Sequence, residues 1–174
     1  MELTNQVIKL TTFEQSDFEL FCQMRMCPEM MEHIYTPFTL EETKVRFDAS
    51  LLPWDESSSD WLSFSITLIE SSEKVGNIAI KITDHAAKIA EVGFMIAQSA
   101  QGQGVGSQAL SLIKGFAFND LKLNKLEATC AVANTASYKL LEKHGFIREE
   151  ELKNNSEING KWVDDYRYGL MQKN

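Results

Sequence analysis

The sequence has few cysteines and histidines, and their spacing argues against two kinds of site. The three cysteines, Cys22, Cys27 and Cys130, form no Cys-x-x-Cys pair, and an odd number is typical of free thiols in a reducing compartment. The three histidines have neither His-x-x-x-His spacing nor a neighbouring cysteine. We therefore expect no disulfide and no metal site, and we interpret Cys130 as a small buried strand residue rather than a nucleophile.

Basic residues and long apolar runs are also scarce. The 17 lysines and arginines are outnumbered by 25 aspartates and glutamates, which gives a net charge of −8. Nucleic acid is not an expected partner, because binding it requires clustered basic side chains. No apolar stretch approaches membrane-spanning length and the first residues show no signal-peptide pattern, so we expect a cytoplasmic protein that binds no membrane. The length of 174 residues, 44% of them hydrophobic, predicts a single domain over residues 1–174.

Glycines number only nine, yet three of them lie at alternate positions, Gly102, Gly104 and Gly106. They follow an apolar stretch typical of a strand, residues 91–96, and precede an amphipathic helical pattern over residues 105–116. Glycines leave the backbone open to an anion, and the N-terminus of a helix favours negative charge. A plain turn between strand and helix is the alternative. The neighbouring sequence favours a loop that binds a phosphorylated cofactor.

Two common phosphate-binding loops do not match this segment. A nucleoside triphosphatase loop needs a lysine directly after its last glycine, whereas Ser107 follows Gly106. A dinucleotide-binding fingerprint needs its third glycine one residue later and an acidic residue at the end of the next strand, where the sequence has Ala131 to Ala133. The segment therefore argues against nucleoside triphosphate hydrolysis, and dinucleotide binding remains only as an alternative.

Two motifs in the correct order resemble the GNAT superfamily of acyl-CoA-dependent N-acetyltransferases. Gln101, Gly104 and Gly106 match the pattern Gln/Arg-x-x-Gly-x-Gly/Ala, and residues 134–146 resemble the second motif, ending in Glu-Lys-x-Gly-Phe. Residues 163–166 resemble the closing strand of the ribosomal-protein N-acetyltransferase-like subfamily. The resemblance implies an α/β (α+β) fold, with a mixed, mostly antiparallel central sheet, helices on both faces and a splayed cofactor cleft.

Hydrophobic periodicity and capping residues predict elements in the order of that family. We expect Ser16 to cap a first helix that ends near Pro28, and Thr39 with Glu42 to form the capping box of a second. A further helix should follow at residues 135–144. The expected strands are residues 7–10, 63–69, 75–82, 91–96, 126–132 and a final pair that begins at residue 146 and turns at residues 159–160.

The resemblance also implies acetyl-CoA as cosubstrate and a set of residues that bind it. Backbone groups of strand 91–96 would bond the pantetheine arm, amides of the glycine loop would hold the pyrophosphate, and an asparagine would fix the far side of the cofactor. Asn134 is equally able to serve as a helix N-cap, and both roles are compatible. The residues expected at the cofactor are Phe94, Met95, Ile96, Gln101, Gly102, Gln103, Gly104, Val105, Gly106, Ser107 and Asn134.

Two residues are candidates for the chemistry. Glu91 resembles the position from which relatives supply a basic carboxylate, and the alternative is a structural carboxylate that pairs with a neighbouring strand. Many relatives protonate the departing thiolate with a tyrosine, whose position here is Leu141. Ser137 is the expected substitute, with a helix-surface hydroxyl as the alternative. Tyr138 is a poorer candidate because it faces another side of the helix.

These features predict an enzyme that transfers acetyl from acetyl-CoA to a primary amine by direct attack in a ternary complex. A protein N-terminus is the expected acceptor, because an α-amine of pKa about 8 loses its proton more readily than an alkylamine of pKa about 10.4. The alternatives are a small-molecule acceptor, such as a polyamine, amino acid or antibiotic, and a non-catalytic acyl-CoA sensor. A monomer and a homodimer are both compatible with the sequence.

Overall fold

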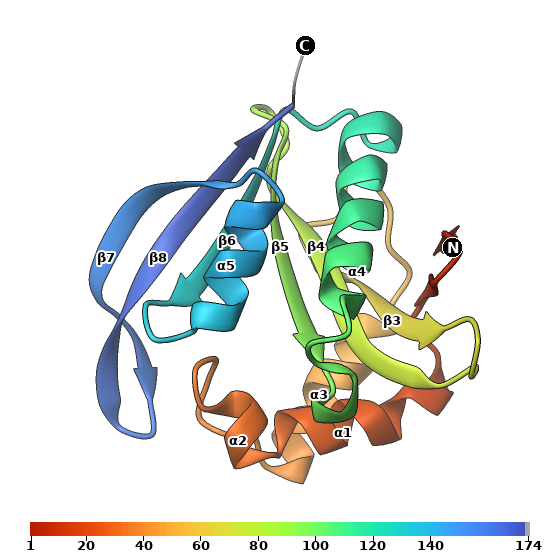
Figure 1. Cartoon of the computed structure of the whole chain (residues 1–174), viewed down its shortest axis with the longest axis horizontal. Helices are drawn as coiled ribbons and strands as arrows, with labels where there is room; N and C mark the ends of the chain where they lie inside the picture. Colours follow the sequence, from red (N-terminus) through yellow and green to blue (C-terminus); the bar gives the residue numbers. More distant parts are fainter. Residues whose placement is uncertain (173–174) are drawn as a thin grey trace.

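An eight-stranded sheet forms the centre of the computed structural model, which describes residues 1–172 (Figure 1). Neighbouring strands follow the order β1-β2-β3-β4-β5-β6-β8-β7, and only β5 and β6 pair in parallel. The predicted mixed, mostly antiparallel sheet is therefore confirmed. Its strands are β1 (Glu2–Thr4), β2 (Ile8–Thr12), β3 (Leu62–Leu68), β4 (Lys74–Asp84), β5 (Ile89–Ile96), β6 (Lys125–Ala131), β7 (Ile147–Ile158) and β8 (Lys161–Met171).

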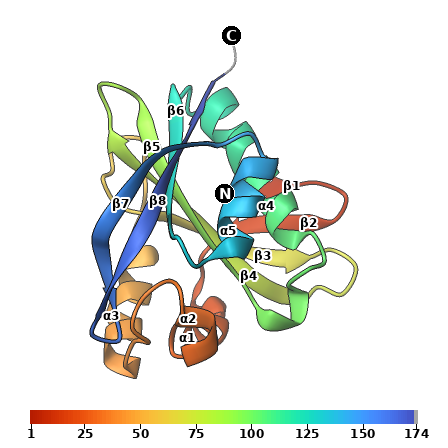
Figure 2. The same ribbon diagram turned by 60° about the vertical axis from the view of Figure 1, so that its left-hand side comes forward.

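Helices cover both faces of this sheet. In two views turned by 60°, α4 runs alongside β4 and β5, whereas α1, α2 and α3 form a separate group at one end (Figures 1 and 2). The α-helices are α1 (Phe18–Arg25), α2 (Pro28–Met31), α3 (Leu40–Ser50), α4 (Val105–Gly115) and α5 (Thr135–Lys143). Short helical turns are η1 (Gln15–Asp17), η2 (Gln98–Ala100) and the π-helical η3 (Phe116–Asp120), which continues α4.

Strand alternation explains how the two helical layers attach. Side chains along a strand point alternately to opposite faces of the sheet. On one face, Ile78 and Ile80 of β4 belong to the same buried cluster as Ile113 of α4. On the other face, Met95 of β5 clusters with Met24 of α1. The sheet therefore separates a large core under α4 from a smaller core under α1 and α2.

The N-terminal region departs from the prediction at three places. No sequence pattern predicted β1, a three-residue edge strand, or α2, which begins at Pro28 directly after the predicted break. Ser16 is not a cap, because it lies inside η1, and the N-cap residue of α1 is Asp17. Asp17 is buried and accepts a 2.8 Å hydrogen bond from the N–H of Glu14. Its other oxygen lies 2.8 Å from Nζ of Lys74, which balances the buried charge.

The capping box at the start of α3 is confirmed. The N–H of Glu42 donates to Oγ1 of Thr39 over 3.2 Å, and the N–H of Thr39 donates to the Glu42 carboxylate over 2.8 Å. Replacing Thr39 with alanine should lower the free energy of unfolding by about 1 kcal/mol, because a helix N–H loses its acceptor. Thr39→Ser keeps the hydroxyl and should be nearly neutral. Urea denaturation of both variants measures the difference, and equal losses would argue against the cap.

Candidate active site

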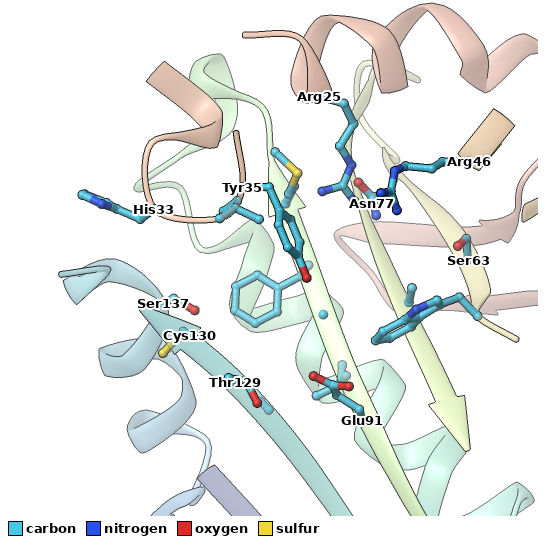
Figure 3. Close-up of a pocket in the computed structure, with 18 of the residues that line it drawn as sticks. Arg25, His33, Tyr35, Arg46, Ser63, Asn77, Glu91, Thr129, Cys130 and Ser137 are labelled. Atoms are coloured by element: carbon cyan, nitrogen blue, oxygen red, sulfur yellow. The ribbon is translucent and has the colours of Figure 1, made fainter. Parts of the chain in front are cut away.

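The cleft begins where β5 and β6 stop pairing. Their parallel ladder contains three pairs, of which Glu91 with Glu127 is the last. Beyond this pair β6 continues against β8 while β5 continues against β4, so the facing edges of β5 and β6 have no strand partner. A cavity of about 400 Å³ opens at this place, with Val92 to Met95 on one side and Ala128 to Ala131 on the other (Figure 3). The predicted splayed cleft is therefore present.

The glycine loop lies at the far end of β5 and leads into α4. Gly102 and Gly104 have φ values of +76° and +81°, a left-handed conformation that glycine adopts without strain. A Cβ atom at either position would meet no atom within 4 Å, so this side of the loop is open. The first hydrogen bond of α4 runs from the N–H of Gln108 to the carbonyl oxygen of Gly104. The amides of residues 105–107 precede that bond and are available to an anion.

The side chains of the loop are used to hold its shape. The Gln101 amide donates to the carbonyl oxygen of Ile96 over 3.0 Å, and the Gln103 amide donates to that of Ser99 over 2.7 Å. Both glutamines therefore anchor the loop to the segment before it. We expect any contact with phosphate groups to come from the loop's backbone.

Gly106 and Ser107 connect α4 to α5. A Cβ atom on Gly106 would lie only 3.0 Å from Cδ2 of Leu140, so the missing side chain allows the two helices to approach closely. Oγ of Ser107 lies 2.7 Å from Nε2 of His144, at the end of α5. The side-chain positions of Gly106 and Ser107 thus serve helix packing, and only their N–H groups face the loop's open end.

Asn134 has the capping role that was one of its two predicted functions. It is the N-cap residue of α5, and its Oδ1 accepts a 3.1 Å hydrogen bond from the N–H of Ser137. Asn134 also lines the cavity. Its position is therefore compatible with a contact to a bound molecule in addition to the cap.

Glu91 lies at the point where the two strands begin to diverge, and its side chain faces the cavity (Figure 3). It is half-buried, and no carboxylate-to-lysine or carboxylate-to-arginine ion pair involves it among residues 1–172. Burial raises the pKa of Glu91, and the charge of Glu127, its partner in the ladder, raises it further. Glu127 itself is paired with Lys125 over 2.8 Å. Glu91 is therefore placed to accept a proton inside the cavity.

Ser137 and Cys130 lie together on the opposite wall of the cavity (Figure 3). Burial raises the pKa of the Cys130 thiol to about 11, so the thiol stays protonated and is a poor nucleophile, as the sequence suggested. Leu141 also lines the cavity and is almost fully buried. Tyr138 packs edge-on against Tyr166 instead, with ring centroids 5.9 Å apart.

The end of the cavity next to α1 and α3 contains residues that the sequence did not identify. Arg25, Tyr35 and Arg46 come from three separate segments and line this end together with Asn77 of β4 (Figure 3). No short motif links them, so neither spacing nor residue type could indicate their proximity. The packing of α1 against α3 brings them together.

Residues 1–172 include no group of three or more histidine, cysteine, aspartate or glutamate side chains that could hold a metal ion. Over the same residues, no helix is both long and apolar enough to cross a membrane.

A family model, curated relatives and solved structures all relate this chain to N-acetyltransferases. An acetyltransferase (GNAT) domain family model matches residues 8–147. An uncharacterized N-acetyltransferase, p20, from Bacillus licheniformis is 27% identical over 98% of this chain and 96% of its own length. Spermidine N-acetyltransferase from Vibrio cholerae, solved with CoA and spermine, has the same fold with a TM-score of 0.84, 20% identity and coverage of 97% of both chains.

A ribosomal L7/L12 α-N-protein acetyltransferase, RimL, solved in complex with coenzyme A, also has the same fold. Its TM-score is 0.84, with 20% identity and coverage of 98% of each chain. The family match covers β2 to β6, the glycine loop and the second motif, in the order in which the sequence presents them. The chain therefore belongs to the GNAT acetyltransferase family, and it is an N-acetyltransferase whose cosubstrate is acetyl-CoA.

Proposed function

We propose that this protein acetylates the N-terminal amine of a protein or peptide, by direct attack of the amine on the thioester of acetyl-CoA. The observation that carries the proposal is the position of Glu91, whose carboxylate faces the cavity at the last pair of the β5–β6 ladder. The same cavity offers no activated nucleophile that could carry the acetyl group, because the pKa of Cys130 is raised. Direct transfer in a ternary complex is therefore the simplest route.

The cofactor site is built largely from backbone. The unpaired edge of β5 at residues 94–96 offers N–H and C=O groups to the amides of a pantetheine arm, much as another strand would. The open amides of residues 105–107 and the free space at Gly102 and Gly104 fit a pyrophosphate at the N-terminus of α4. Asn134, at the N-terminus of α5, would contact the cofactor from the other side of the cleft.

Glu91 would act as the general base, directly or through a water molecule. An ammonium group must lose a proton before its nitrogen can attack a carbonyl carbon. A carboxylate of raised pKa is a better proton acceptor than an ordinary glutamate, and Glu91 makes no ion pair within 4.0 Å among residues 1–172, although the more distant charges of Lys81 and Arg167 oppose part of the increase in its pKa. After the attack, the thiolate leaves while it accepts a hydrogen bond from the Ser137 hydroxyl, because Leu141 cannot donate one.

We choose an N-terminal amine because the site offers only a half-buried carboxylate as base and a serine hydroxyl as hydrogen-bond donor. At pH 7 about a tenth of the molecules of an α-amine of pKa near 8 are neutral, against roughly one in a few thousand for an alkylamine. A site with one half-buried carboxylate and a serine hydroxyl therefore suits an α-amine better. The resemblance of residues 163–166 to relatives that modify ribosomal proteins supports the same choice.

The acceptor class can be tested by comparing kcat/KM for three sets of amines. We expect short peptides with free N-termini to react faster than N-terminally blocked peptides that carry lysine, and faster than spermidine. Mass spectrometry of the products locates the acetyl group. A clear preference for spermidine, or equal rates on the blocked peptides, would contradict the proposed acceptor.

A further inference from the structure

Two of the four arginines in this acidic chain face the same end of the cavity. Arg25 is the last residue of α1, and Arg46 lies in α3. Both guanidinium groups point toward Asn77 of β4, at the end of the cavity away from Glu91 (Figure 3). The cavity therefore has a carboxylate on one side and two positive charges on the other.

Neither guanidinium has a carboxylate partner within 4.0 Å among residues 1–172. Both guanidinium groups stack on aromatic rings instead. Cζ of Arg25 lies 5.2 Å from the ring centroid of Phe21, and Cζ of Arg46 lies 4.3 Å from that of Phe38. By contrast, Arg167 on β8 makes a 2.9 Å ion pair with Glu150. The stacked arrangement leaves the N–H groups at the edges of both guanidinium planes available to a ligand.

The placement of these two charges is unfavourable without a counterion. Burial lowers the pKa of Arg25 to about 10, and the proximity of Arg46 contributes to the lowering. Arg25 is nevertheless charged at neutral pH, since this pKa is still well above 7. The carboxylates that line the cavity, Asp60, Glu91 and Asp165, are not within ion-pair distance of either arginine. An incoming anion would relieve the repulsion and gain charge-assisted hydrogen bonds.

Asn77 gives independent support for a polar ligand at this end. Only 4% of Asn77 is exposed, and its Oδ1 has no hydrogen-bond partner among the described residues. Buried polar atoms in folded proteins are almost always paired, so an unpaired one next to a cavity indicates a group that arrives with the ligand. A ligand with an anionic group and a neighbouring N–H or O–H would satisfy the arginines and the amide together.

We propose that the acceptor carries a carboxylate close to its reactive amine, and that Arg25 and Arg46 bind this carboxylate while the amine faces Glu91. The inference rests on the proposed function and narrows its substrate class. On the proposed function, the carboxylate belongs to an acidic side chain near the N-terminus of a peptide. A free amino acid is the competing source of the same group, and its selection would replace the peptide acceptor. Spermidine, which carries only positive charge, does not fit this end of the cavity.

Matched acceptors separate these possibilities. Ala-Glu-amide and Ala-Gln-amide differ only in the side-chain charge. Free alanine differs from alaninamide in its own carboxylate and in the higher pKa of its amine, so the kcat/KM values of that pair are compared per neutral amine. We expect the wild type to favour one acid over its amide by about 10- to 100-fold in kcat/KM, the usual effect of hydrogen bonds to a charged group. The favoured pair identifies the source of the carboxylate.

The role of the arginines is tested with the variants Arg25→Gln and Arg46→Gln. Each should reduce the preference in kcat/KM for the acid over its amide by about 10-fold or more. Arg148→Gln is the control, because Arg148 also stacks on a ring, that of Tyr166 at 4.2 Å, but does not line the cavity. The affinity for acetyl-CoA should be unchanged in all three variants, which also shows that they fold. Equal rates for acid and amide, or a preference that survives in both cavity variants, would overturn the inference.

A second readout keeps this inference separate from the proposed function. Calorimetry measures the binding of the two dipeptide amides and the two alanine compounds to the CoA-bound protein, without any acetyl transfer. If no amine is acetylated, the proposed function fails. The calorimetric preference for acid over amide, and its dependence on Arg25 and Arg46, then still decide whether the cavity binds a carboxylate.

Discussion

Replacing Glu91 with glutamine is expected to lower kcat by about 10²- to 10⁴-fold at neutral pH, the usual effect of losing a positioned general base. Glutamine has nearly the same shape, so the fold and the affinity for acetyl-CoA should be retained. The loss should shrink as the pH rises, because a larger fraction of the amine is then neutral without help. Wild-type turnover by the Glu91→Gln variant at neutral pH would make Glu91 a structural carboxylate.

The raised pKa of Glu91 gives this prediction a second part. The base works only when it is ionised, so activity should fall as the pH decreases through its pKa, which burial and the charge of Glu127 raise above the usual value. Glu127→Gln removes the neighbouring charge that contributes to the raised pKa. That variant should keep its turnover at neutral pH, and the acidic limb of its pH profile should move to lower pH. An unmoved limb would mean that another group controls it.

Placing an aspartate at Gly104 should weaken acetyl-CoA binding by about 100-fold or more, because a negative charge a few ångströms from a pyrophosphate costs several kcal/mol near a protein surface. Aspartate and asparagine tolerate the left-handed conformation of this residue better than most side chains, and both are good N-cap residues. Gly104→Asn is therefore the matched control, with the same size and the same backbone strain but no charge.

Calorimetry of the two Gly104 variants measures the dissociation constant of acetyl-CoA, and thermal unfolding shows that both fold. The asparagine variant should lose much less affinity than the aspartate variant, so that the difference reports the charge alone. Equal affinities for aspartate, asparagine and wild type would mean that the pyrophosphate lies elsewhere.

Features that depend on a few adjacent residues could be predicted from the sequence. The glycine loop, the capping box at Thr39 and the strand before the loop are local patterns, and the structure contains all three. The N-cap residue of the first helix was predicted wrongly, although it too was inferred from a local pattern. Ser16 has the right residue type, but it lies inside the helical turn η1, whose N-cap residue is Glu14, and α1 begins only after Asp17.

The end of the cavity next to α1 and α3 could not be predicted, because it depends on tertiary packing. Arg25 and Arg46 lie in separate helices and come together only where an aromatic cluster joins α1 to α3. At its centre is Phe47, whose ring centroid lies 5.5 Å from that of Phe21 and 5.1 Å from that of Phe18. In the sequence these aromatic residues indicate only a core, and nothing in their spacing shows that two charged neighbours will share a cavity.

A crystal structure with a non-transferable thioether analogue of acetyl-CoA is the strongest test of the proposed site. We expect the pyrophosphate to contact the amides of the loop at residues 102–107 and the pantetheine arm to run along residues 94–96. The acetyl group should then lie beside Glu91, with the space toward Arg25 left for the acceptor. An analogue bound away from the β5–β6 cleft, or an acetyl group out of reach of Glu91, would contradict the proposed site.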